Sequence, residues 1–109
     1  MQWLLARGAP RDAHDYLGAT ALSWASENGL TETVRGLIAA GAGVNIADHG
    51  SWTPLHRASY HGHTKTVRAL IAAGAGVNIV GSDNRTPLHL AIDRGHTDIV
   101  NALRDAGGI

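Results

Sequence analysis

One block of ten residues occurs twice in this chain without a change. Residues 37–46 read LIAAGAGVNI, and the same letters return at residues 70–79, 33 positions later. Over the whole period, residues 15–47 and 48–80 are identical at 20 of 33 positions, which chance does not produce. Self-similarity at a fixed period of about 20 to 50 residues is the signature of a repeat architecture. The chain is therefore predicted to be an array of stacked units.

The period divides the chain into consecutive units without a linker between them. Residues 4–9 align with residues 37–42, so the chain starts within the second half of a unit. The sequence shows no low-complexity segment and no sign of a second domain. The predicted division is a partial repeat at 1–14, full repeats at 15–47 and 48–80, and a final repeat at 81–109.

The two ends of the array differ in character. In the last unit Arg104 and Asp105 stand where the middle unit has Ile71 and Ala72. Terminal units of a solenoid need a polar outer face because no neighbour covers them, so the last unit is predicted to be a C-terminal cap. At the N-terminal edge an apolar surface is left uncovered, and Trp3 is expected there as a core residue or a lid. We expect a monomer, or a weak end-to-end dimer through this edge.

The first half of each unit has the pattern of a short helix. In the middle unit Thr53 is the predicted N-cap, and Pro54 follows at the first helical position, where its missing N–H costs nothing. The helix is predicted to run to about His61, and Gly62 is predicted to end it.

The second half of each unit has the pattern of another helix followed by a loop. Thr64 is the predicted N-cap. Val67, Leu70 and Ile71 fall at positions i, i+3 and i+4, which places them on one apolar face. Gly74 then ends the helix and leads into an extended turn. Each unit is therefore predicted to be helix–turn–helix–loop, and the fold to be an all-α solenoid.

These residues resemble the ankyrin-repeat family. Residues 53–58 (TPLHRA) and 86–91 (TPLHLA) match its T-P-L-H-x-A signature, and the Gly-His pairs at 62–63 and 95–96 match its turn between helices. The resemblance covers nearly the whole chain at the right period. It implies an L-shaped stack in which loop tips and first helices line a concave face and second helices form the back.

Some positions depart from the family's pattern. Residues 20–23 read TALS and lack the proline and histidine, while Gly43 and Gly76 stand where an aspartate is usual. Gly81 stands where the middle unit has Asp48. We expect these departures to weaken local hydrogen bonds without changing the fold.

The resemblance accounts for four of the seven histidines. His56 and His89 belong to the T-P-L-H elements, and His63 and His96 belong to the Gly-His turns. In this family such histidines tie adjacent loops together through hydrogen bonds from side chain to backbone, so the resemblance implies a structural role for them.

Asn45 and Asn78 lie in the loop that follows the second helix. The resemblance implies that this is the type of position that asparaginyl hydroxylases modify. The alternative is a hydrogen-bonded turn residue, which we expect here.

The sequence contains no recognisable catalytic motif. Without cysteine there is no thiolate nucleophile and no Cys-based zinc site, and the metalloprotease, P-loop and serine-hydrolase motifs are absent. We expect no enzymatic activity and no cofactor. His14, His49 and His61 lie outside the repeat pattern. A metal or small-molecule site using His49 and His61 is the alternative, although the pattern places no third ligand beside them.

Charge and hydropathy give no indication of a nucleic-acid or membrane partner. Nine basic residues balance nine acidic ones, for a formal net charge of zero. No stretch approaches the roughly 18 continuous apolar residues of a membrane-spanning helix. The apolar start is interrupted at Arg7, short of a signal-peptide core. We expect an intracellular protein, cytoplasmic or nuclear.

Differences between otherwise similar units indicate where a partner binds. They gather in the loop before each first helix and at the end of that helix, and nearly all the aromatic residues lie in or beside these positions. Trp, Tyr and Arg dominate binding hot spots because they bury a large area at small entropic cost. Packing between repeats is the alternative, and we expect it less for Trp52 and Tyr60 than for Trp24. The predicted partner-binding residues are Tyr16, Leu17, Trp24, Glu27, Asn28, His49, Trp52, Arg57, Tyr60, His61, Asp83, Arg85, Asp93 and Arg94.

The sequence therefore predicts a protein–protein interaction module without catalysis, which binds a protein partner through its concave face and loop tips. Two other functions compete with it. One is the metal- or small-molecule-binding protein described above. The other is a structural segment of a longer array that makes no partner contacts of its own.

Overall fold

The computed structural model describes residues 20–108. Within this range the chain forms six helices, arranged in three pairs. The first helices of the units are α2 (Ala21–Glu27), α4 (Pro54–His61) and α6 (Pro87–Arg94), and the second helices are α3 (Thr31–Ala39), α5 (Thr64–Ala72) and α7 (Thr97–Asp105). The predicted all-α, helix–turn–helix–loop architecture is confirmed. The described residues do not include Trp3, His14, Tyr16, Leu17, the partial repeat at 1–14 or the N-terminal edge.

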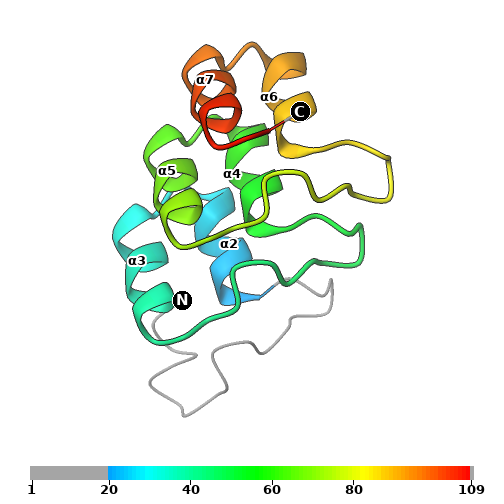
Figure 1. Ribbon diagram of the computed structural model, residues 1–109. Coiled ribbons are helices and arrows are strands. Elements are labelled where there is room, and N and C mark those ends of the chain that lie inside the picture. The colour runs from blue at the N-terminus through cyan, green and yellow to red at the C-terminus, as the bar shows by residue number, and fades with distance from the viewer. Residues whose placement is uncertain (1–19, 109) are drawn as a thin grey trace.

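The helices stand in two layers (Figure 1). Helices α2, α4 and α6 pack side by side in one layer, α3, α5 and α7 form the other, and the loops between units extend away from both on one side. The core lies between the layers and repeats with the period of the sequence, because each unit buries the same positions. Its largest residues include Leu22, Leu55 and Leu88 from the first helices, and Leu37, Leu70 and Leu103 from the second.

The first helices begin where the sequence predicts. At α4 the Thr53 N–H donates to His56 Nδ1 (3.1 Å), and Thr53 Oγ1 accepts from the His56 N–H (3.4 Å), which satisfies two otherwise unpaired helix-end donors. The same capping box forms at α6. The proline-free segment of the earlier unit also forms a helix, because Thr20 Oγ1 accepts from the Ser23 N–H (3.1 Å).

The predicted N-cap of the second helix is wrong. Thr64 is the first residue of α5, and the N-cap is His63, whose side chain makes no capping hydrogen bond. Gly62 adopts a left-handed conformation (φ 79°), and the His63 N–H then donates to the Ala58 carbonyl (3.0 Å). This tight turn lets the helical conformation begin at Thr64, and it leaves the His63 ring available to reach the preceding unit.

Histidine side chains tie the units together, as the resemblance implies. Nε2 of His63 bonds to the Glu27 carbonyl (2.9 Å), Nε2 of His96 to the Tyr60 carbonyl (3.2 Å) and Nε2 of His56 to the Arg85 carbonyl (3.0 Å). The His89 ring instead accepts from the Thr86 N–H within its own unit (3.1 Å).

The loops that follow the second helices are also bonded to one another between successive units. Asn45 Oδ1 accepts from the Gly76 N–H (2.8 Å), and Asn78 Nδ2 donates to the Gly107 carbonyl (3.1 Å). Both asparagines are therefore hydrogen-bonded loop residues, as expected.

The outer face of the last unit exposes both charged and apolar side chains. Arg104 and Asp105 are exposed. On α6, however, Ile92 is 48% exposed, whereas Ser59, the equivalent residue of α4, is fully buried. The assignment of this unit as a C-terminal cap therefore stays a prediction. Within residues 20–108, no helix is long and apolar enough to cross a membrane.

Gly36 offers a test of how far helix propensity limits the stability of this array. It lies exposed within α3, and a Cβ added there meets no atom within 4 Å. We expect Gly36→Ala to raise the free energy of unfolding by about 0.5–1 kcal/mol, because glycine loses more backbone entropy in a helix than alanine. Urea denaturation measures the change.

Gly62→Ala is the contrasting variant. Its backbone is left-handed (φ 79°), and an added Cβ would lie 2.8 Å from the His96 ring. It should lose stability in the same measurement. A Gly36→Ala protein no more stable than the wild type would contradict the first expectation.

Candidate functional site

Three rings, those of Trp52, His56 and Tyr60, cluster at the first helix of the middle unit, with Trp52 in contact with both others. Trp52, just before the N-cap of α4, stacks on His56 with ring centroids 6.0 Å apart and an interplanar angle of 18°. Its ring also lies 5.4 Å from that of Tyr60. His56 and Tyr60 share one face of α4 because they are four residues apart, and the Trp52 ring, which comes from the loop before the helix, lies close to both of them. His56 is fully buried, whereas Trp52 and Tyr60 are half-buried and keep an accessible edge.

Two arginines lie against these rings. The guanidinium carbon of Arg57 is 5.0 Å from the centroid of the Trp52 ring, and that of Arg94, at the end of α6, is 4.6 Å from the centroid of Tyr60. Both distances are within the range of a cation–π contact. We refer to Trp52, Tyr60, Arg57 and Arg94 together as the aromatic platform.

A buried carboxylate holds one side of the aromatic platform in place. The side chain of Asp48 is 2% exposed, and its Oδ2 accepts from Nε of Arg57 (3.0 Å) and also contacts the terminal nitrogen Nη2. Its Oδ1 accepts from the backbone N–H groups of Gly50 (2.9 Å) and Trp52 (3.1 Å). The second terminal nitrogen of Arg57 donates to Glu27 Oε1 (3.2 Å) in the preceding unit. Asp48 therefore links the loop backbone at Gly50 and Trp52 to the side chain of Arg57 in one hydrogen-bond network.

A glycine in the next unit makes room for the tryptophan. A Cβ added at Gly81 would lie 2.7 Å from Cδ1 of the Trp52 ring, closer than atoms can approach. Gly81 occupies the position equivalent to Asp48, and the two loops keep the same backbone hydrogen bond. The Gly81 N–H donates to the Arg85 carbonyl (3.0 Å), and the Asp48 N–H donates to the Trp52 carbonyl (2.9 Å). The missing acid at position 81 therefore accommodates Trp52. Trp52 packs between repeats as well as presenting an accessible edge, which its position in the loop did not lead us to expect.

His61 borders the aromatic platform beside Tyr60. Its ring lies edge-on to that of Tyr60 (5.1 Å between centroids), and Nε2 is 3.8 Å from Glu27 Oε1. Partial burial lowers the pKa of His61, the nearby charges of Arg57 and Arg94 lower it further, and Glu27 opposes the shift. His61 is therefore largely uncharged at neutral pH.

The structure brings together some of the predicted partner-binding residues and leaves others apart. Trp24 is 43% exposed on α2, Asn28 donates from Nδ2 to the Trp24 carbonyl (2.9 Å), and His49 is exposed in its loop. The residues joined by the contacts above are Glu27, Trp52, Arg57, Tyr60, His61 and Arg94. Tyr16 and Leu17 lie outside the described residues.

Three of the four predicted residues of the last unit form a local group, whereas the fourth, Arg94, contacts Tyr60. Arg85 and Asp93 are joined by an ion pair, and Asp83 Oδ1 accepts from the Arg85 N–H (3.3 Å). Arg85 and Asp93 line a depression with His89 and Ile92 at the C-terminal end of the stack.

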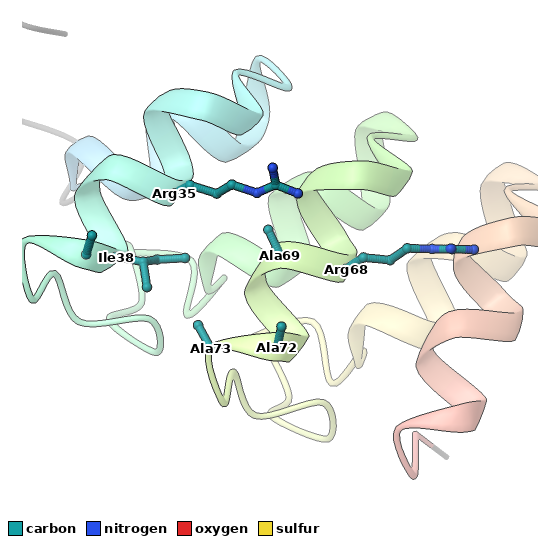
Figure 2. A pocket seen from close by; sticks show the side chains of 7 residues that line it. Arg35, Ile38, Arg68, Ala69, Ala72 and Ala73 are labelled. Atoms are coloured by element: carbon teal, nitrogen blue, oxygen red, sulfur yellow. The ribbon is translucent and has the colours of Figure 1, made fainter.

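The back of the molecule carries a shallow groove between α3 and α5, with a volume of about 420 Å³. Figure 2 shows its small floor residues and the two long side chains of Arg35 and Arg68, which extend in the same direction. The residues that line it are Arg35, Ile38, Ala39, Arg68, Ala69, Ala72 and Ala73. None of the predicted partner-binding residues belongs to it.

The described residues contain no group of three or more His, Cys, Asp or Glu side chains that could hold a metal ion. The His63 ring lies 6.2 Å from that of His61 between centroids. Its Nε2 already bonds to the Glu27 carbonyl, so this nitrogen is occupied and does not serve as a second metal ligand. The alternative of a metal site on the middle repeat thus gains no support from the geometry.

Comparison with known proteins agrees with the architecture. The family model for ankyrin repeats, in three copies, matches residues 22–109. A search of curated proteins found no match. Ankyrin repeats are generally protein-interaction modules and are typically non-catalytic. The match spans most of the chain and coincides with the paired, stacked helices, so this chain belongs to the ankyrin-repeat family.

Proposed function

We propose that this chain is a non-catalytic module that binds a protein partner through the aromatic platform, on the concave side formed by its loops and first helices. One observation carries the proposal: two large rings, Trp52 and Tyr60, are only half-buried, although an arginine and neighbouring residues hold each of them in place. Side chains of these types supply most of the binding energy in protein interfaces.

The rigidity of the aromatic platform supports the same function. Arg57 is held by both Asp48 and Glu27, and Trp52 lies between the His56 ring and Gly81. A surface that is already ordered loses little side-chain entropy on binding, so more of the contact energy appears as affinity.

The proposal has further parts that rest on the sequence. We expect an intracellular location, cytoplasmic or nuclear, and a monomer or a weak end-to-end dimer through the N-terminal edge. We expect neither nucleic acid nor membrane as a partner, because the formal net charge of zero provides no electrostatic attraction to phosphate groups.

The double variant Trp52→Ala/Tyr60→Ala tests the proposal. Partners captured from cell extract on the wild-type chain are identified and purified, and their affinities are measured by calorimetry. We expect the double variant to bind at least about 30-fold more weakly, which corresponds to about 2 kcal/mol for the loss of two central aromatic contacts. Circular dichroism checks that the variant is folded.

Two controls separate this function from its competitors. Arg68→Ala alters an exposed side chain on α5, away from the aromatic platform, and should leave binding unchanged. A folded double variant that binds as tightly as the wild type would instead favour a structural segment of a longer array. Metal analysis of the purified protein addresses the other competitor, which a stoichiometric metal lost in His61→Ala would favour.

A further inference from the structure

Two of the three arginines around the aromatic platform are paired with carboxylates, and Arg94 differs from them. Arg57 lies between the carboxylates of Asp48 and Glu27, and Arg85 is paired with Asp93. The Arg94 side chain lies over the face of the Tyr60 ring, and among the described residues no carboxylate lies within ion-pair distance of it.

The position of Arg94 leaves its hydrogen-bond donors available. The residue is exposed, and the ring of Tyr60 lies against the guanidinium group. Stacking uses the flat face of a guanidinium, whereas its N–H donors point outward in the plane of the group. This planar set of donors matches the two oxygens of a carboxylate. His61, next to Tyr60, is largely uncharged at neutral pH and offers no competing charge.

The opposite end of the aromatic platform carries an acidic group. Asp83 follows Gly81, against which Trp52 packs, and its Oδ1 would lie 3.1 Å from a Cβ at position 81. Asp83 is exposed, and its charge acts on His56, the ring stacked on Trp52. The two half-buried rings are thus flanked by the exposed carboxylate of Asp83 at the Trp52 end, where Arg57 is already paired with Asp48 and Glu27, and by Arg94 at the Tyr60 end.

We propose that the aromatic platform selects an acidic protein segment, one that places a large apolar side chain on Trp52 and Tyr60 and a carboxylate on Arg94. Apolar area on the rings supplies affinity, and the carboxylate sets the orientation of the segment, because the reverse orientation would bring it to Asp83. This inference rests on the proposed function, since it names the chemistry of the partner at the same surface.

A phage-displayed library of random 12-residue peptides, selected on the full chain, provides the probe. The recovered peptides are synthesised, and their affinities for the wild type and for variants are measured by fluorescence polarisation. We expect the peptides to combine Asp or Glu with an aromatic or large aliphatic residue. Arg94→Glu should weaken their binding about tenfold or more, because it replaces a charge-assisted bidentate pair by repulsion.

Arg68→Glu is the matched control. It makes the same change of charge on another exposed arginine, which lies on the back of the molecule (Figure 2), so it should alter affinity less than about twofold. Arg94→Lys keeps the charge but loses the fork of donors, and its affinity should fall between those of the wild type and Arg94→Glu.

The outcomes separate the inference from the function on which it rests. Peptides that need Trp52 and Tyr60 but carry no acidic residue and tolerate Arg94→Glu would overturn the inference and leave the proposed function standing. Peptides that respond to Arg68→Glu more than to Arg94→Glu would also overturn it. A selection that yields no peptide sensitive to Trp52→Ala/Tyr60→Ala would count against both.

Discussion

Replacing His56 with alanine is expected to lower the free energy of unfolding by about 2–3 kcal/mol, measured by urea denaturation. The His56 side chain is fully buried, Nδ1 accepts from the Thr53 N–H, and Nε2 bonds to the Arg85 carbonyl in the next unit. The substitution leaves a backbone donor and a backbone acceptor without their partners and opens a cavity beneath Trp52.

His89→Ala is the matched control within the same chain. His89 forms the same capping box with Thr86, but its ring is exposed, not buried between two units. We expect a loss of no more than about 1 kcal/mol, the usual contribution of a helix cap. Equal losses at His56 and His89 would show that the bond to the Arg85 carbonyl contributes nothing.

The same histidine should make stability depend on pH. Burial lowers the pKa of His56 below its ordinary value of 6.5, and the bond to the Arg85 carbonyl and the charges of Asp83 and Asp48 oppose this shift only in part. A group whose pKa is lower in the folded state binds fewer protons there than in the unfolded state. Its contribution to stability is therefore complete above 6.5 and is lost as the pH falls below that value.

Denaturation at pH 7.5 and 5.5 checks this sign. The wild type should unfold at a lower urea concentration at the lower pH, and His56→Ala should reduce the difference. A wild type that becomes more stable on acidification, by an amount that His56→Ala removes, would contradict the assignment.

Asp48→Ala is expected to have the second large effect, a loss of about 3 kcal/mol in the free energy of unfolding. Four donors of Gly50, Trp52 and Arg57 converge on this carboxylate, whose side chain is 2% exposed. Without the Asp48 carboxylate, the half-buried guanidinium of Arg57 keeps only its ion pair with Glu27. The loop that positions Trp52 also loses its two hydrogen bonds to Asp48. Breaking one partner of a buried ion pair costs much more than the pair itself contributes, because the remaining charge is left desolvated.

Glu32→Ala shows how an exposed pair behaves. Glu32 and Arg35 form an ion pair on the surface of α3, with side chains that are 89% and 62% exposed. Its removal should cost less than about 0.5 kcal/mol. Asp48→Asn, which keeps an acceptor for the loop but removes the charge, should fall between the two. If Asp48→Ala lost no more stability than Glu32→Ala, the buried network would not hold the loop.

Local sequence rules were sufficient for most of the fold. The period of 33 residues, the predicted cap at Thr53 and the predicted stop at Gly62 indicated helix positions that the structure confirms. These signals work because a helix start and a helix stop each depend on a few neighbouring residues. The N-cap was predicted one residue too late, because the left-handed turn at Gly62 lets the helix begin at Thr64.

The candidate site was predictable only in outline. Variation between units and the preference of interfaces for Trp, Tyr and Arg singled out Trp52, Arg57, Tyr60 and Arg94. In the sequence Asp48 was noted only as the acid that Gly81 replaces in the last unit, although it orders the loop and holds Arg57. Its partner is nine positions away, across a loop and a helix turn, and no local pattern signals such a pair.

The repeat period and the capping residues were enough to establish that this chain stacks helical pairs, because each of these features acts within one unit. Which side chains form a surface was decided by contacts between units. Trp52 lies over Gly81 of the next unit, Arg57 reaches Glu27 of the preceding one, and Arg94 covers a ring of the middle unit. Such contacts depend on how one unit is placed against another, and that placement exists only once the array has folded.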